Sequence, residues 1–137
     1  MSDVRANTPL LEIDDLRVGF GANPASASLT VHGVSLRMDE GRIVGLVGES
    51  GSGKSLTCRS ILRLLPDRGH IVSGSVRFDG RDVLGMSRAE LLAFRSKQVG
   101  MIFQDPFSLL NPTRRIGSQM VEALRLALGV PEETARG

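Results

Sequence analysis

A glycine-rich stretch constrains the fold of this chain more than any other feature. Residues 45–55 are "GLVGESGSGKS", in which Gly48, Gly53, Lys54 and Ser55 match the spacing G-x-x-x-x-G-K-[ST] of a phosphate-binding loop. Glycine permits positive φ and lets backbone N–H groups approach an anion without an intervening Cβ. A helix that follows the loop adds its own unpaired N–H groups and the positive end of its dipole. The stretch therefore predicts a site for nucleotide phosphates.

The flanking sequence favours this interpretation over a flexible glycine-serine turn. The run "IVGLV" at 43–47 is typical of a short buried strand. After the loop, apolar residues at helical spacing predict a helix that Pro66 ends, and they are Leu56, Ile61, Leu62, Leu64 and Leu65. Strand, loop and helix in this order are the context of the motif. We expect Lys54 to reach the β- and γ-phosphates and the Ser55 hydroxyl to bind Mg²⁺.

Composition bounds the class of protein. The chain has 137 residues, 41% of them hydrophobic, which suits one small globular domain. Its net charge of +2 and scattered arginines give no reason to expect nucleic acid as a partner. The N-terminus, "MSDVRANTPLLEIDDL", has acids where a signal peptide needs an apolar core, and no apolar run could span a bilayer. We therefore expect a cytoplasmic chain. Cys58, the only cysteine, is expected to be a small buried thiol.

The remaining pattern predicts alternating strands and helices. A capping box, Ser87 with Glu90, opens one helix, and Gly129 with Pro131 stops the last long one. Strands are expected at 10–20, 29–39, 99–104 and within 73–83, the last ending in an Asp79-Gly80 turn, and helices at 87–98, 116–129 and from about 131. A strand-rich start before a strand–loop–helix unit predicts a mixed α/β sheet.

Two long blocks resemble a known family. "VSLRMDEGRIVGLVGESGSGKS" (34–55) and "VGMIFQDPFSLLNPTRRIGSQMVEAL" (99–124) are together similar to the ATP-binding subunits of ABC transporters. "GESGSGKS", "MIFQDP" and "LNP" are most similar to the dipeptide, oligopeptide and nickel import branch. The resemblance implies an α/β P-loop NTPase fold, an ABC-type nucleotide-binding domain with an N-terminal antiparallel β subdomain. The β subdomain and P-loop core would occupy 9–104, and the start of a helical subdomain 105–137.

The resemblance also implies a site for ATP and Mg²⁺. Phe20 falls where the family has an aromatic residue that stacks on adenine, although a strand-end core role suits it equally well. Gln104 matches the Q-loop glutamine, which helps hold Mg²⁺ and the attacking water. Catalytic roles are thus implied for Lys54 and Gln104, and metal binding for Ser55 and Gln104. The implied nucleotide contacts are Phe20, Gly48, Glu49, Ser50, Gly51, Ser52, Gly53, Lys54, Ser55 and Leu56.

Partners follow from the same resemblance. Residues 105–120 would face the transmembrane permease subunits, with Phe107, Leu109 and Leu110 either forming a docking patch or lying in the local core. A second ATPase subunit would pair with this one, and an extracytoplasmic solute-binding protein would act indirectly. The protein would then sit peripherally at the cytoplasmic face of the membrane. The family implies ATP hydrolysis coupled to import of a solute, a peptide by family, although the sequence does not identify it.

The chain departs from the family after Gln104. The LSGGQ signature, the Walker B strand ending in Asp-Glu, the D-loop and the switch histidine are all missing from the 137 residues. We therefore expect the chain to be the N-terminal part of the domain. Alone it should bind nucleotide weakly or not at all and hydrolyse it negligibly, because phosphoryl transfer needs those groups to position water and stabilise charge.

Two other functions stay open. Asp105, after the apolar run 99–104, resembles a Walker B aspartate, so the protein could be a small non-transport NTPase or kinase that uses it for Mg²⁺. A GTPase-like D-x-x-G at Asp82 to Gly85 is weaker, because no apolar strand precedes it and no N-K-x-D occurs. The chain could also be a non-catalytic remnant that keeps the permease-facing surface and binds no nucleotide.

Overall fold

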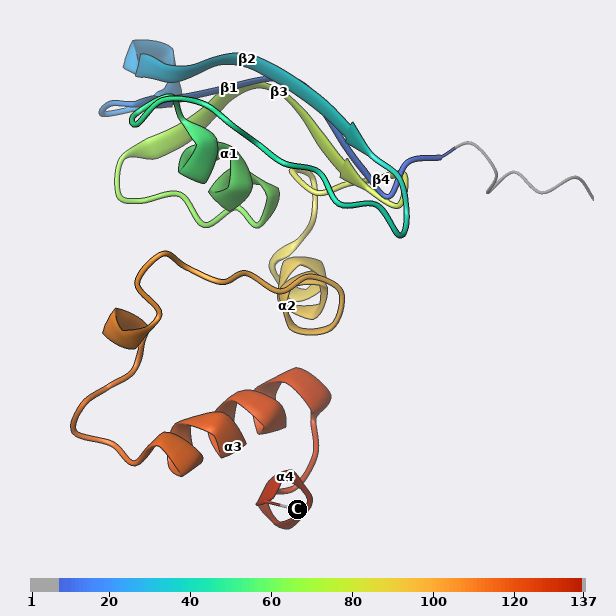
Figure 1. Cartoon of the computed structure of the whole chain (residues 1–137), viewed down its shortest axis with the longest axis vertical. Coiled ribbons are helices and arrows are strands. Elements are labelled where there is room, and N and C mark those ends of the chain that lie inside the picture. The colour runs from blue at the N-terminus through green and yellow to red at the C-terminus, as the bar shows by residue number, and fades with distance from the viewer. Residues whose placement is uncertain (1–7, 137) are drawn as a thin grey trace, which may run out of the picture. The chain divides into compact units, whose positions relative to one another are not determined.

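The computed structural model of the protein describes residues 8–136. Residues 1–7, the start of the N-terminal stretch "MSDVRANTPLLEIDDL", lie outside this range. The described residues form two compact units, one up to Met86 and one from Ser87 onward (Figure 1). The subdivision at residue 104 that the family resemblance implies remains a prediction.

The first unit is built on a four-stranded antiparallel sheet in the order β2-β1-β3-β4 (Figure 1). Its strands are β1 (Leu11–Phe20), β2 (Ser28–Met38), β3 (Gly69–Phe78) and β4 (Arg81–Asp82), and a short 3₁₀ turn, η2 (Pro24–Ser26), joins β1 to β2. The strands predicted at 10–20 and 29–39 are confirmed. So is the turn at Asp79 and Gly80, whose φ angles of 49° and 73° suit a tight hairpin. The third strand starts earlier than predicted, because Gly69 already pairs with Phe20.

A bulge interrupts the central strand of this sheet. Asp15 has a φ of 43°, and the pairing of β1 with both neighbours shifts register next to it. The facing residues are Gly33 and Gly74, with φ of 95° and 94°. A Cβ on Gly74 would lie 2.5 Å from the carbonyl oxygen of Asp15, so only glycine fits there. Such bulges sharpen the local twist of a sheet.

Helix α1 (Lys54–Ile61) contacts β1 and β2. The core of this unit is aliphatic and consists of Leu11, Ile13, Leu16, Val18, Val31, Leu62, Val76 and Val83. The buried positions within α1 are Thr57 and Ser60, whose hydroxyls donate to the carbonyl oxygens of Gly53 at 3.0 Å and Leu56 at 2.7 Å. These bonds to the preceding turn satisfy hydroxyls that burial removes from water.

Two expectations for this helix are wrong. Cys58 is exposed, because the helix buries its Thr57 and Ser60 side and turns position 58 away from it. The helix also ends at Ile61 rather than at Pro66. Leu62 acts as the C-cap and Arg63 takes a φ of 51°, which breaks the helical path before the proline is reached.

The strands predicted at 43–47 and 99–104 do not form in the structure. Neither run has a strand partner, and Ile43, Val47 and Ile102 are 100%, 93% and 92% exposed. An apolar run indicates a tendency to be buried, but a strand also needs neighbours with which to form its hydrogen bonds. In the described part of the chain, the four strands pair only with one another and none pairs with residues 43–47 or 99–104. Both strand predictions are therefore wrong.

The second unit is helical. It contains α2 (Arg88–Lys97), the 3₁₀ turn η3 (Phe107–Leu109), α3 (Ile116–Leu128) and α4 (Glu132–Arg136), with α3 in contact with both α2 and α4. The capping box is confirmed: Glu90 N–H donates to Ser87 Oγ at 3.3 Å, and Ser87 N–H donates to Glu90 Oε2 at 2.8 Å. Gly129, with φ of 68°, ends α3 as predicted. Within residues 8–136, no helix combines the length and apolar character needed to cross a bilayer.

Candidate phosphate-binding site

The glycine-rich loop folds back on itself just before α1. Gly51 and Gly53 take φ of 83° and 88°, and Ser52 N–H donates to Glu49 O at 3.3 Å. Gly53 is the N-cap of α1, where no side chain accepts from the first turn. The first N–H groups of a helix have no intrahelical partner, so the loop delivers a set of donors and the positive helix end to one place. This arrangement suits an anion.

The side chain of Lys54 folds back and donates hydrogen bonds to the loop that precedes it. Its Nζ donates to Gly48 O at 2.8 Å, to Glu49 O at 2.5 Å and to Ser52 Oγ at 3.2 Å. A lysine ammonium has three donors, and these three contacts use them all. A phosphate oxygen that reached Nζ would therefore replace at least one of them. Contact of Lys54 with a phosphate group stays a prediction.

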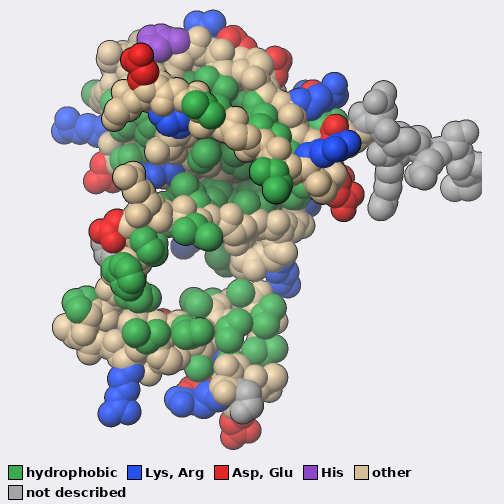
Figure 2. Space-filling view, viewed as in Figure 1, with side chains coloured by type: hydrophobic (Ala, Val, Ile, Leu, Met, Phe, Trp, Pro, Cys, Tyr) green, Lys and Arg blue, Asp and Glu red, His purple; other side chains and the backbone are tan. Residues whose placement is uncertain are grey.

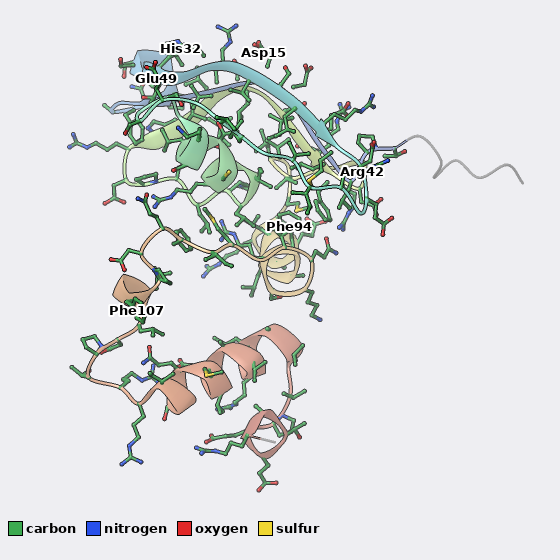
Figure 3. The ribbon with its side chains drawn as sticks, viewed as in Figure 1. Asp15, His32, Arg42, Glu49, Phe94 and Phe107 are labelled. Atoms are coloured by element: carbon green, nitrogen blue, oxygen red, sulfur yellow. The ribbon has the colours of Figure 1, made fainter. Side chains whose placement is uncertain are left out.

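Strand β2 supports the loop from behind. A Cβ on Gly53 would lie 2.8 Å from Val31 Cγ2 and 3.4 Å from Thr30 O, so the loop and the strand touch at a point where a larger residue would collide. Val31 belongs to the buried core, which fixes the position of this contact. The labelled side chains of Glu49 and His32 mark the loop and β2 in Figure 3. This supporting role of Val31 cannot be predicted from the sequence, because no local signal points to it.

Three other predicted contacts in the first unit are Ser55, Leu56 and Phe20. Ser55 is exposed in the first turn of α1, and Leu56 is half-buried. Phe20 is the half-buried last residue of β1, and a Cβ on Gly69 would lie 3.3 Å from its ring. The ring therefore lies against the backbone of the neighbouring strand with part of its surface exposed. Stacking of Phe20 on adenine stays a prediction.

Gln104 belongs to the second unit. Gln104 is exposed and follows the apolar run 99–103, which is not a strand in the structure. A position beside the phosphate loop, and with it the predicted role in holding Mg²⁺, stays a prediction. Among residues 8–136 there is no group of three or more His, Cys, Asp or Glu side chains that could hold a metal ion by itself.

Neither of the two aspartate motifs noted in the sequence, the Walker B-like Asp105 and the D-x-x-G at Asp82, has the geometry that its motif requires. Asp105 does not follow a strand in the described residues, whereas a Walker B aspartate ends one. Asp82 forms a local turn, because its Oδ1 accepts from Leu84 N–H at 2.9 Å. The D-x-x-G match is thus a turn after β4.

Comparison with known proteins decides the family. The family model described as "ABC transporter" matches residues 31–135, which include the phosphate loop and most of the second unit. The chain belongs to the ABC transporter family. A bacterial ABC exporter of the Atm1 family, solved with ATP bound, has a similar fold over 85% of this chain and 18% of its own, with a TM-score of 0.54 and 25% sequence identity.

Curated relatives of this ABC-family chain include transport ATP-binding proteins. It is 38% identical over 130 residues to the oligopeptide transport ATP-binding protein OppD of Bacillus subtilis, covering 94% of this chain and 36% of that protein. It is 45% identical over 130 residues to the probable D,D-dipeptide transport ATP-binding protein DdpD of Escherichia coli, covering 93% and 39%. The chain thus spans somewhat more than a third of the length of these relatives.

Proposed function

We propose that this chain supplies the ATP-binding loop of an ABC-type importer subunit that couples ATP binding and hydrolysis to solute uptake. The observation that most supports this proposal is the geometry of the phosphate loop. The loop ends in a left-handed Gly53 packed against Val31, and the ammonium of Lys54 is held inside it. Membership of the ABC transporter family supports ATP as the nucleotide.

The proposed roles follow from the groups that the chain presents. Lys54 Nζ and the N–H groups at the start of α1 would bind the β- and γ-phosphates. The exposed Ser55 hydroxyl would ligate Mg²⁺, which neutralises charge on the phosphates when it is bound. Gln104 would complete the metal shell and orient water, and Phe20 would offer its exposed ring surface to the base.

We propose a peptide as the transported solute. The support is the similarity to proteins named for oligopeptide and D,D-dipeptide transport, at 38% and 45% identity. A second ATPase subunit, permease subunits and an external solute-binding protein would complete the transporter. In that assembly the protein would be peripheral at the cytoplasmic face of the membrane.

We place the permease contact on residues 105–120. Phe107, which is labelled on the η3 turn in Figure 3, is 81% exposed. Leu109 in the same turn is also exposed. Ile116 and Met120 add exposed apolar surface on α3. Figure 2 shows hydrophobic side chains along the face of the second unit that is in view. Clusters of exposed apolar side chains of this kind are typical of protein interfaces.

The experiment that tests this function compares the only two lysines of the chain. Lys54→Ala should weaken binding of ATP with Mg²⁺ at least about tenfold, because charge-assisted hydrogen bonds to phosphate are lost. Lys97→Ala, at the exposed end of α2, should bind as the parent does. Isothermal titration calorimetry gives both affinities, and circular dichroism checks that the variants are folded. Equal ATP binding by folded Lys54→Ala would refute the proposal.

A second variant separates the transporter from a small self-contained NTPase. Asp105→Asn should leave ATP binding and its Mg²⁺ dependence unchanged if the protein is an importer subunit. Loss of Mg²⁺-dependent turnover in this variant would instead favour Asp105 as the metal carboxylate.

A further inference from the structure

We propose that Gln119 is a positioning residue for the permease contact. Its side chain holds the turn formed by Asn111–Arg114 onto α3 and thereby presents the exposed apolar residues of η3. This inference rests on the proposed function of residues 105–120 and adds to it the element that gives that surface its shape.

Gln119 uses its whole amide group on the backbone of this turn. Its Oε1 accepts from Asn111 N–H at 2.9 Å, while its Nε2 donates to Asn111 O and to Arg114 O, both at 3.1 Å. The donors and acceptors match only in this orientation of the amide, because the opposite one would place the NH₂ group against an N–H. The residue is also half-buried, unlike most of α3.

The turn is closed by its own contacts as well. Asn111 Oδ1 accepts from Thr113 N–H at 2.9 Å and from Thr113 Oγ1 at 2.7 Å, and Arg114 N–H donates to Asn111 O at 3.1 Å. An asparagine side chain that bonds two residues ahead is a common turn former, and the intervening proline restricts the backbone further. The turn is therefore closed by its own hydrogen bonds, and Gln119 binds its backbone at Asn111 and Arg114.

A second contact ties the same turn to the same side of α3. Arg114 Nη1 lies 2.7 Å from Glu122 Oε2, three residues after Gln119 and thus on a neighbouring turn of that helix face. This pair is about half exposed, so it contributes little to stability. The hydrogen bonds of the Gln119 amide are more directional than the ion pair between Arg114 and Glu122.

The consequence concerns η3. Leu110 N–H donates to Phe107 O at 3.2 Å, and Asn111 follows directly, so the apolar turn and the clamped turn are continuous. Gln119 does not cap α3, because its bonds go to the preceding loop rather than to the free N–H groups of the helix. A docking surface that is ordered before binding avoids the entropic cost of ordering it on contact.

The test uses the full-length subunit, alone and assembled with its permease in lipid vesicles. Three variants are compared with the parent: Gln119→Ala, Gln119→Glu and a control at an exposed position of α4 outside residues 105–120, Thr134→Ala. Glutamate keeps an acceptor for Asn111 N–H but sets a carboxylate oxygen against the two carbonyl oxygens that Nε2 served. Amide hydrogen exchange at Asn111, ATP affinity, basal ATPase rate and permease-dependent ATPase stimulation are measured for each.

Both Gln119 variants should lose permease-dependent stimulation about fivefold or more, the lower end of typical coupling between sites. Gln119→Ala should also exchange the Asn111 amide faster. ATP affinity and basal rate should stay at the parent level, and Thr134→Ala should match the parent throughout. A merely structural role would not separate coupling from basal turnover.

Several results would overturn the inference. Full stimulation in Gln119→Ala despite faster exchange at Asn111 would show that the clamp is dispensable. Equal loss in Thr134→Ala would show that the effect is not specific to the amide of Gln119. A parent that binds ATP but gains nothing from the permease would refute the permease contact itself, and the inference with it. Absence of ATP binding by the parent would instead refute the proposed function at the phosphate loop.

Discussion

At Gly53 a single missing Cβ decides whether the phosphate loop can close. The residue has a φ of 88°, and a side chain there would meet Val31 at 2.8 Å, whereas Gly51 has a φ of 83° and open space around it. The two glycines thus share the same backbone requirement and differ only in their neighbours. This difference gives a matched pair of substitutions.

We predict that Gly51→Ala lowers the free energy of unfolding by about 1 kcal/mol, the cost of a left-handed conformation for an L-residue. Gly53→Ala should cost about 2–3 kcal/mol, because the collision with Val31 adds to that strain. Urea unfolding followed by circular dichroism measures both. Equal losses for the two variants would contradict the tight contact between the loop and β2.

At the scale of single elements, α2 depends on its N-terminal cap. The Ser87 hydroxyl and the Glu90 carboxylate each accept from the other residue's N–H group. We predict that Ser87→Ala lowers the free energy of unfolding of the helical unit by about 1 kcal/mol. Ser87→Asp should retain most of the stability, since aspartate also caps helices well. If the alanine and aspartate variants unfolded alike, the cap would not contribute to stability.

Helix α4 carries the pH dependence that the structure predicts. Glu132 Oε1 accepts from Arg136 Nε at 3.0 Å and from Nη2 at 2.6 Å. This hydrogen bond and the charge of Arg136, with a smaller contribution from Arg125, hold the pKa of Glu132 below its ordinary value of 4.5. Because the pKa is lower in the folded state, the pairing stabilises α4 fully above pH 4.5 and is lost as pH falls through the lowered folded value.

We therefore expect the amide chemical shifts of Glu133–Arg136 to change in acid with a midpoint below that of an ordinary glutamate. An NMR pH titration measures this midpoint. In Glu132→Gln the same amides should not show the step at that pH. A midpoint at or above the ordinary value in the parent would contradict the pairing with Arg136.

At the scale of the whole molecule, two apolar runs remain outside any sheet. Ile43, Val47 and Ile102 are almost fully exposed, although both runs have the composition of parallel strands buried on two faces. In the 137-residue chain we predict that Ile43→Thr and Val47→Thr each change the free energy of unfolding by no more than about 0.5 kcal/mol. Val18→Ala, in the core, should cost about 1–3 kcal/mol under the same conditions.

The exposed runs should also be visible to a dye. The double variant Ile43→Thr/Val47→Thr should bind less of the hydrophobic dye ANS than the parent, because it exposes less apolar surface. A large loss of stability from either single threonine substitution would mean that the run is buried, in conflict with the structure described here.

The sequence by itself determined every feature whose cause is local. The loop spacing predicted a turn with left-handed glycines before a helix, and Ser87 with Glu90 predicted a capped helix. Asp79-Gly80 predicted a hairpin, and Gly129 a helix end. Each depends on a few neighbouring residues whose φ angles and hydrogen bonds can be inferred from their side chains. The match of two distant motifs at their spacing was enough to indicate the family.

Only the tertiary structure decided which segments find partners. Hydrophobicity predicted strands at 43–47 and 99–104, but strand formation needs neighbours that no local pattern specifies. The contact of Gly53 with Val31, the exposed position of Cys58 and the three bonds of Gln119 to the Asn111 turn also join residues through the folded backbone. A local sequence pattern predicts a helix or strand, and packing against residues distant in the sequence determines whether that element forms and which side chains it positions.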